Sequence, residues 1–333
     1  MKLNVGLLGG GSWGTTVASL TARNCPTKIW ARDVATVHEI NQHHRNEKYL
    51  PGADLTPSLK AFSSIKETVE DADVIVMGIP AQYFRQVLKD ARPYIRPWVP
   101  IISLSKGLEV GTMMRMTEVI EAEMEGHPAG VLTGPNLAKE IIIGQAAASV
   151  IAMVDETIAK RLQKVFKTGL FRVYTNEDVI GCELGGALKN IIAIAAGMGD
   201  GSGAGENTRA AIITRGLAEL TRLGVAMGGQ PITFAGLAGM GDLVATCSSE
   251  KSRNRTVGYQ LGLGRKIEEI IEDMAEVAEG VKTAKVVMQL AEKYDMNMPI
   301  AKSVYEVLYE GSTARDAFKG LLRMDIGSEA GPG

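Results

Sequence analysis

Three glycines near the N-terminus constrain the fold more than any other feature of this sequence. Gly9, Gly11 and Gly14 follow a short apolar segment, residues 3–8, and precede residues 15–23, whose composition is typical of a helix. In this strand–turn–helix context, the first glycine of G-x-G-x-x-G permits a tight turn and the second lets a pyrophosphate approach the backbone. The third lets the helix pack closely on the strand. We therefore predict a dinucleotide-binding βαβ unit at the N-terminus.

The backbone at the start of this helix supplies the expected anion-binding groups. The N–H groups of Ser12 and Trp13 would be among those that bind the pyrophosphate. A competing interpretation is a secretory signal, because Met1 and Lys2 precede an apolar stretch and small residues at 18–22. The glycine pattern between a strand and a helix favours nucleotide binding.

Apolar segments that predict strands alternate with helical patterns over roughly the first 175 residues. Residues 73–79 form a near-continuous apolar run that ends at Pro80, as expected for a parallel strand covered on both faces. The other predicted strands are residues 27–31, 60–62, 99–104, 131–133, 147–153 and 171–174. The alternation predicts a parallel sheet built from βαβ units.

The second half of the chain shows helices and glycine-rich connectors but no convincing strand. Its longest predicted helices are residues 179–196 and 207–227. With 333 residues the chain is long enough for two domains. We predict an α/β fold: an N-terminal Rossmann dinucleotide-binding domain over residues 1–179, followed by an all-α substrate domain over residues 180–333.

Composition and charge exclude several classes of protein. The chain has 36 Lys and Arg against 38 Asp and Glu, a net charge of −2, which argues against a nucleic-acid binder. No run of 18 apolar residues occurs, so we expect no membrane span. Three cysteines without disulfide or CxxC spacing favour a reducing, cytoplasmic setting. The four histidines form no metal-binding pattern, and we expect no metal.

The end of the second predicted strand bears on which dinucleotide is bound. NAD-binding domains usually place an acidic residue there, whereas NADP-binding domains place a cation that pairs with the 2′-phosphate. This chain has Arg32 followed by Asp33. The alternatives are that Arg32 is only a solvated charge, and that Asp33 points away or caps the next helix. We favour NADP(H), with NAD(H) as the second cofactor.

Lys189 is the main candidate for acid–base chemistry, because it lies within an otherwise apolar predicted helix. A lysine in a desolvated pocket beside a second cation can exchange a proton near neutral pH. Lys106 could be that cation, since it ends a predicted strand at the edge where α/β sheets bind ligands. Asp242, after a glycine-rich turn, could orient the lysine. The structural alternatives are a snorkelling Lys189 and an Asp242 that only caps a helix or turn.

Ser252, Arg253 and Asn254 begin another predicted helix after a polar loop. Ser252 is a candidate N-cap, and the helix N–H groups together with Arg253 and Asn254 could form a phosphate-binding site. The alternative is a charged first turn that binds no ligand.

Taken together, these segments resemble the bacterial-type NAD(P)-dependent glycerol-3-phosphate dehydrogenases over most of the chain. The resemblance is carried by residues 9–14, 105–107, 134–135, 183–190, 207–210, 239–242, 252–255 and 279–283. It implies a Rossmann domain with an all-α substrate domain. It also implies a small phosphorylated triose as substrate: dihydroxyacetone phosphate and sn-glycerol 3-phosphate would be interconverted for glycerophospholipid synthesis. The oligomeric state stays open, with a homodimer as one alternative.

The resemblance also implies roles for individual residues. Lys189 would be the catalytic proton donor and acceptor. The residues that would line the cofactor are Gly9, Gly11, Ser12, Trp13, Gly14, Arg32, Lys106, Ala138, Arg253, Val277 and Glu279. The residues that would hold the substrate are Lys106, Gly134, Asn136, Lys189, Asn190, Asp242, Ser252, Arg253 and Asn254. Many members carry Ser or Thr at the position of Asn136, so its amide would replace a hydroxyl contact.

Two other functions compete with this one. A β-hydroxyacid or 6-phosphogluconate-type dehydrogenase resembles it in layout and catalytic lysine, but typically carries Asn four residues after that lysine, where this chain has Ala193. A non-catalytic dinucleotide sensor would need neither Lys189 nor Arg253. The glycine-rich segment 197–205 is expected, from composition, to close over the site.

Overall fold

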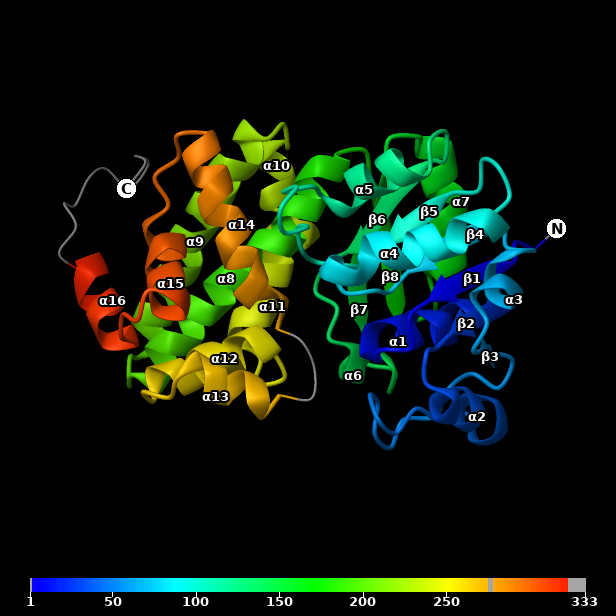
Figure 1. Cartoon of the computed structure of the whole chain (residues 1–333), viewed down its shortest axis with the longest axis horizontal. Coiled ribbons are helices and arrows are strands. Elements are labelled where there is room, and N and C mark those ends of the chain that lie inside the picture. The colour runs from blue at the N-terminus through cyan, green and yellow to red at the C-terminus, as the bar shows by residue number, and fades with distance from the viewer. Residues whose placement is uncertain (1, 275–277, 323–333) are drawn as a thin grey trace. The chain divides into compact units, whose positions relative to one another are not determined.

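The computed structural model describes residues 2–274 and 278–322, which form two units (Figure 1). The second unit comprises the chain from Ile180 onward together with the short segment Gly107–Met113. This segment lies before residue 179, where the sequence suggests a boundary. It packs with the helical unit because Leu108 is fully buried in that unit's hydrophobic core.

The first unit contains one eight-stranded sheet. Its strands are β1 (Val5–Leu8), β2 (Thr27–Trp30), β3 (Lys60–Phe62), β4 (Val74–Met77), β5 (Ile101–Ser103), β6 (Ala129–Thr133), β7 (Ala147–Met153) and β8 (Phe171–Asn176). The spatial order is β3-β2-β1-β4-β5-β6-β7-β8. Neighbouring strands are parallel, apart from the antiparallel pair β6 and β7.

The antiparallel pair departs from the fully parallel sheet that the alternation of strands and helices predicts. The connection from β6 to β7 holds only a four-residue helix, α6 (Ala138–Ile141). Such a helix rises about 6 Å, whereas the seven-residue strand β7 spans about 23 Å. The helix therefore cannot carry the chain back to the starting edge of β6, and β7 runs in the opposite direction.

Helices cover both faces of the sheet and enclose a separate core on each. The helical segments of this unit are α1 (Ser12–Thr21), α2 (Val34–His43), α3 (Ile65–Val69), α4 (Ala81–Ala91), η1 (Arg92–Tyr94), α5 (Met116–Glu123), α6 and α7 (Glu156–Phe166). Alternate residues of β4 enter different cores: Val74 and Val76 pack with α1, α2 and α7, and Ile75 and Met77 with α3, α4 and α5. This explains why central strands read as continuous apolar runs.

The described residues of the second unit form helices and connecting loops and no strand. Its segments are α8 (Val179–Gly201), α9 (Glu206–Ala226), α10 (Pro231–Phe234), η2 (Leu237–Gly241), α11 (Asp242–Ser248), α12 (Arg253–Gly262), α13 (Ile267–Glu272), α14 (Glu279–Lys293), α15 (Pro299–Tyr309) and α16 (Ala314–Leu322). By length and composition α8 could cross a membrane, which the sequence analysis does not anticipate, but 94% of its most apolar stretch is buried inside the protein.

Glycines let two of these helices touch backbone to backbone. The glycine-rich segment 197–205 is helical as far as Gly201, because α8 continues to that residue. A Cβ atom at Gly197 or Gly201 would lie 2.1 Å from a backbone oxygen of α12, and one at Gly258 of α12 would lie 2.0 Å from a backbone oxygen of α8. The first part of this segment therefore serves helix packing, which differs from the closing loop expected from composition.

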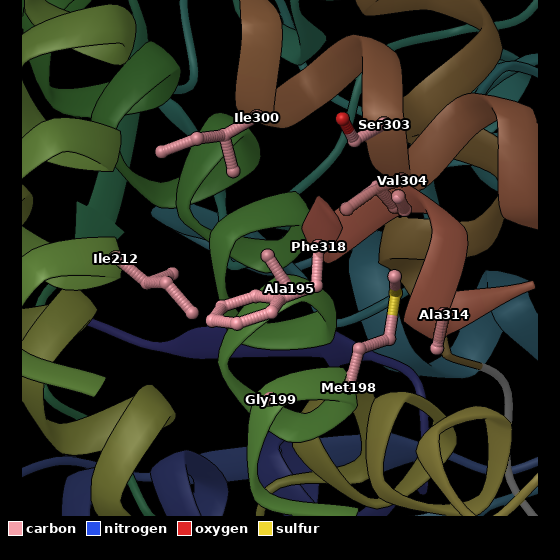
Figure 2. Close-up of a pocket in the computed structure, with 10 residues that line it drawn as sticks. Ala195, Met198, Gly199, Ile212, Ile300, Ser303, Val304, Ala314 and Phe318 are labelled. Atoms are coloured by element: carbon pink, nitrogen blue, oxygen red, sulfur yellow. The ribbon is translucent and has the colours of Figure 1, made fainter. Parts of the chain in front are cut away.

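A small apolar pocket lies among α8, α9, α15 and α16 (Figure 2). Phe318 is the one aromatic residue among the lining residues described, and Ser303 supplies the one hydroxyl. Binding sites combine apolar walls with convergent polar groups that orient the ligand. This pocket has only the Ser303 hydroxyl as a polar side-chain group among its described lining residues. The polar residues that the sequence analysis identifies lie elsewhere.

Candidate active site

The turn between β1 and α1 has the geometry that a dinucleotide requires. Gly9 has a φ of +122°, and a Cβ there would lie 2.3 Å from the carbonyl oxygen of Gly78. A Cβ at Gly14 would lie 2.1 Å from the carbonyl oxygen of Gly9. A Cβ at Gly11 would meet no neighbouring atom within 4 Å, so a ligand can approach its backbone. Two glycines thus permit the turn, and the third leaves room for a pyrophosphate.

This turn also lies where the strand order reverses, since β1 pairs with β2 on one side and with β4 on the other. Open α/β sheets bind ligands at such a point. Helix α1 begins there at Ser12 and has no acidic residue in its first turn. Its N–H groups and dipole therefore favour an anion, and the residues fit the pyrophosphate of NAD(P).

Trp13, in the first turn of α1, is half-buried in the core on this face of the sheet. Its ring lies 6.2 Å from that of Phe171, edge to face, and Ala138 at the start of α6 packs into the same core. The indole Nε1 is buried and has no hydrogen-bond partner among the described residues. An unpaired buried N–H is costly, so Nε1 is a candidate donor to a bound ligand.

Asp33 caps a helix, which was one of the alternatives for it. Its carboxylate accepts the N–H of Ala35 at 3.0 Å and lies 3.5 Å from the Lys48 ammonium. The hydrogen bond from Ala35 is the main cause that lowers the pKa of Asp33. The carboxylate is therefore committed to the N-terminus of α2, whereas the preceding Arg32 is exposed just after β2.

Lys106 and Gly134 follow the neighbouring strands β5 and β6 at their carboxyl ends. The Lys106 ammonium donates to the carbonyl oxygen of Gly134 at 2.7 Å. Gly134 has a φ of +135°, and a Cβ there would lie 3.2 Å from the Cα of Ser149. The glycine thus permits a turn that places a carbonyl oxygen within reach of the lysine.

The orientation of the Asn136 amide follows from a hydrogen-bond chain. The Ser149 hydroxyl donates to the carbonyl oxygen of Thr133 at 2.7 Å, so it must accept from the Asn136 Nδ2 atom at 3.2 Å. The Asn136 Oδ1 atom then faces the other way. It is buried and has no hydrogen-bond partner among the described residues. Asn136 therefore presents an acceptor where a Ser or Thr could also have donated.

In the helical unit, Lys189 and Asp242 form a buried ion pair. Lys189 is 5% exposed and Asp242 is 2% exposed. The Nζ atom lies 3.1 Å from the Asp242 Oδ1 atom and 2.5 Å from the Thr246 Oγ1 atom. A snorkelling Lys189 is therefore excluded, and Asp242 does more than cap a turn.

The hydrogen bonds of this cluster have one consistent direction. The Thr246 hydroxyl donates to the carbonyl oxygen of Asp242 at 2.6 Å, so its oxygen is free to accept from Lys189. An ammonium group has three donors. Asp242 and Thr246 engage two of them, and the third has no partner among the described residues. Asp242 and Thr246 thus hold the Lys189 ammonium in place, and its third N–H can donate to a ligand.

Glycines bring Asp242 to the lysine. A Cβ at Gly185, one turn before Lys189, would lie 2.6 Å from the carbonyl oxygen of Ala238, so η2 packs directly on α8. Helix α11 starts at Asp242 immediately after η2. The sequence analysis does not identify Thr246. This residue lies four positions after Asp242, so the two side chains are on the same face of α11.

A second polar cluster surrounds the start of α12. Ser252 is the N-cap and accepts the N–H of Arg255 at 3.3 Å. The Asn254 Nδ2 atom donates to the Asn190 Oδ1 atom at 2.8 Å, and Asn254 accepts the N–H of Gly280 at 3.0 Å. Arg253, between them, is exposed. The fold thus brings Asn190, next to Lys189 on α8, against the first turn of α12.

The remaining candidates divide between the units. The glycine turn, Lys106, Gly134, Asn136 and Ala138 belong to the first unit, and the Lys189 and α12 clusters to the second. Glu279 is half-buried at the start of α14. Val277 lies outside the described residues.

A Rossmann-type sheet with a helical unit that contains a buried, oriented lysine defines a nicotinamide-dependent dehydrogenase. Family models described as the N-terminus and the C-terminus of NAD-dependent glycerol-3-phosphate dehydrogenase match residues 4–159 and 178–319. The chain belongs to this family.

Individual proteins support the assignment. The chain is 62% identical to glycerol-3-phosphate dehydrogenase [NAD(P)+] 2 of Sphingopyxis alaskensis over 333 residues, which is all of both chains. It is 54% identical to glycerol-3-phosphate dehydrogenase [NAD(P)+] 1 of Mycobacterium bovis, covering 97% of this chain and 95% of that one. The crystal structure of the Coxiella burnetii glycerol-3-phosphate dehydrogenase superposes with a TM-score of 0.93 at 36% identity, covering 97% of this chain and 99% of that one.

Proposed function

We propose that Lys189 moves the proton when this enzyme interconverts dihydroxyacetone phosphate and sn-glycerol 3-phosphate. The chain is an NAD(P)-dependent oxidoreductase of the glycerol-3-phosphate dehydrogenase type. One observation carries the proposed role: Lys189 is buried, is held by Asp242 and Thr246, and keeps one N–H without a partner among the described residues.

The glycine turn and the start of α1 would hold the pyrophosphate of NADP(H) or NAD(H). When bound, the nicotinamide supplies the hydride that reduces the substrate carbonyl and accepts it in the reverse direction. Arg32, exposed just after β2, would pair with the 2′-phosphate of NADP(H). The other tasks, which are to bind the substrate and transfer one proton, belong to the chain's own side chains.

In the reducing direction, the Lys189 ammonium donates a proton to the C2 oxygen as negative charge develops there. Asp242 stabilises the ammonium before the transfer, and Thr246 fixes the position of Nζ. In the oxidising direction, the neutral amine accepts the proton of the C2 hydroxyl. Asn190, next to Lys189 on α8, would stabilise the charge on the C2 oxygen.

The start of α12 would bind the substrate phosphate. Its N–H groups, the exposed Arg253 guanidinium and the Asn254 amide combine a helix dipole with charge-assisted hydrogen bonds. Gripping the phosphate positions C2 for reaction, so binding here contributes to turnover as well as to affinity.

The cellular location and the oligomeric state are proposed in less detail than the reaction. No disulfide joins Cys25, Cys182 or Cys247, which supports a reducing, cytoplasmic setting. The product is the three-carbon phosphate from which glycerophospholipids are built, so we assign the reaction to their synthesis. A homodimer stays a prediction.

The test of this function is NAD(P)H oxidation with dihydroxyacetone phosphate, compared with dihydroxyacetone and with a small β-ketoacid. We expect rapid oxidation with the phosphorylated substrate only. Equal or faster turnover of the β-ketoacid would favour the β-hydroxyacid dehydrogenase alternative. Cofactor binding without turnover of any substrate would indicate a sensor.

A further inference from the structure

Asp200, near the end of α8, is a buried carboxylate that the proposed reaction does not use. It is 6% exposed. Its Oδ1 atom accepts from Nε and an Nη atom of Arg209, both at 2.9 Å. Its Oδ2 atom accepts from Nε and an Nη atom of Arg255, at 2.9 and 2.8 Å. Each oxygen is thus gripped by one arginine fork, and the two arginines come from different helices.

Arg255 belongs to the first turn of α12, the turn that carries Arg253. Its side chain reaches back to α8, while its backbone N–H is capped by Ser252. The neighbouring Asn254 also reaches α8, but at Asn190. Residues 190 and 200 are about 15 Å apart along a helix, at 1.5 Å per residue. One turn is therefore tied to α8 at two widely separated points.

Two separated ties prevent a motion that one tie allows. A helix start held at a single hydrogen bond can pivot about it, whereas a second tie about 15 Å away fixes its direction. The glycine contacts between α8 and α12 hold the two backbones against each other but do not hold any side chain of the first turn. Because the two arginine forks are charge-assisted and planar, the Asp200–Arg255 tie also fixes an angle.

We propose that Asp200 is a positioning residue for phosphate binding, acting through Arg255 on the first turn of α12. This inference rests on the proposed phosphate-binding role of Arg253 and Asn254. Arg255 itself is not a phosphate ligand in this scheme, because its Nε and one Nη atom are bound to Asp200. Its contribution is the direction in which Arg253 and the helix N–H groups point.

The chain offers a matched pair of variants. Arg255→Gln removes the tie to α12 but leaves Asp200 paired with Arg209. Arg209→Gln removes an equivalent fork from the same carboxylate but leaves α12 tied. The two arginine side chains are similarly covered, at 14% and 22% exposed. A merely structural effect of weakening the cluster should appear in both.

The measurements are KM and kcat for dihydroxyacetone phosphate, kcat/KM for dihydroxyacetone, and the melting temperature of each variant. Full loss of a charge-assisted hydrogen bond is worth about 10- to 150-fold in binding, and misdirection should lose part of that. We expect Arg255→Gln to raise KM for dihydroxyacetone phosphate about 5- to 20-fold, with dihydroxyacetone turnover within about twofold. Arg209→Gln should change both by less than about twofold.

Two further variants show whether Asp200 acts through Arg255. Arg255→Lys keeps the charge and should give an intermediate KM, which also covers the case in which Arg255→Gln does not fold. Adding Asp200→Asn to Arg255→Gln should not raise KM further, because the shared tie is already lost.

The outcomes separate this inference from the function on which it rests. If Arg253→Ala raises KM for dihydroxyacetone phosphate but Arg255→Gln does not, the phosphate site stands and the positioning role is wrong. The positioning role is also wrong if both glutamine variants raise KM equally, or if the two substrates lose turnover equally. If Arg253→Ala has no effect on KM, the proposed phosphate site is wrong.

Discussion

Lys189 is retained inside the protein because its charge is compensated. Burying an unpaired ammonium costs several kcal/mol, whereas a buried pair whose other hydrogen bonds are satisfied is tolerated. Asp242 supplies the opposite charge and Thr246 a second acceptor. At the residue scale, the local sequence around Lys189 indicates an unusual lysine, but its two partners lie more than fifty residues away and are identified only by contact.

Lys189→Met tests the proton-transfer role. Methionine fills a similar volume without a charge, and the loss of a general acid typically lowers the rate about 10²- to 10⁴-fold. We expect kcat to fall by that factor while the dissociation constant for NADPH, measured by fluorescence titration, stays within about twofold. A near-normal kcat would remove Lys189 from the reaction.

Arg32→Ala tests which group binds the 2′-phosphate of NADPH. Asp33 is committed to capping α2, so Arg32 is the charge left at this strand end for NADPH. We expect NADPH to lose about 10-fold or more in affinity and NADH to lose little, because a charge-assisted hydrogen bond is worth about 1.5–3 kcal/mol. Titration with both cofactors decides this, and equal losses would leave at most a stacking role for Arg32.

The helix crossing of α8 and α12 shows how glycine acts at the scale of elements. Gly197, Gly201 and Gly258 have no side chain to separate the helices, so backbone meets backbone. From the sequence alone, Gly197 and Gly201 suggest a mobile loop. Glycine composition does not distinguish the two, because a residue without Cβ permits both flexibility and close approach.

Gly258→Ala should destabilise the helical unit. The added Cβ would lie 2.0 Å from a backbone oxygen of α8, which cannot move without shifting the helix. Overpacking of this kind costs roughly 1–3 kcal/mol, measured as the free energy of unfolding in urea. The control is Gly320→Ala in α16, where a Cβ meets nothing within 4 Å. It should stabilise by about 0.5–1 kcal/mol, and a similar loss in both variants would contradict the packing argument.

Glu219 links helices α9 and α15 and should make stability depend on pH. It is 2% exposed and accepts the N–H groups of Ile300 and Ala301 at 2.8 and 3.2 Å. Burial raises its pKa from 4.5 to about 7. The native state therefore holds this proton more tightly than the unfolded chain. The resulting stabilisation is complete below about pH 4.5 and is lost as the pH rises through about 7.

Glu219→Gln isolates this contribution because glutamine does not ionise. Relative to the variant, the wild type should lose free energy of unfolding between pH 5 and 7, at up to about 1.4 kcal/mol per pH unit. Urea denaturation at several pH values measures the difference, in which other titrating groups cancel. Parallel curves for the two proteins would mean that Glu219 titrates in the ordinary range.

At the scale of the whole molecule, the units are not simple consecutive halves of the chain. The segment Gly107–Met113 belongs with the helical unit although it lies between two strands of the sheet. Leu108 is buried in the core of the helical unit, far in sequence from its neighbours there. Composition indicates where the strands end and the helices begin. It does not indicate that a short loop between two strands belongs to the helical unit.

Leu108→Ala should therefore weaken the helical unit and spare the cofactor site. Truncating a fully buried leucine costs about 2–5 kcal/mol. We expect the free energy of unfolding, followed by helical circular dichroism, to fall by that amount, while the dissociation constant for NADPH changes less than about twofold. A marked loss of NADPH affinity with little change in stability would assign Leu108 to the first unit instead.

The sequence by itself determines the two-part architecture, the glycine turn and the principal polar residues. These depend on short-range rules: strand–turn–helix spacing, apolar periodicity, and the residue types that bind phosphate or move protons. Tertiary structure alone decides which polar groups meet. Four features join residues from different elements: the pairing of Lys189 with Thr246, the binding of Asp200 by two arginines, the direction of the Asn136 amide and the reversal of β7. Such contacts depend on how the elements pack, which local pattern does not encode.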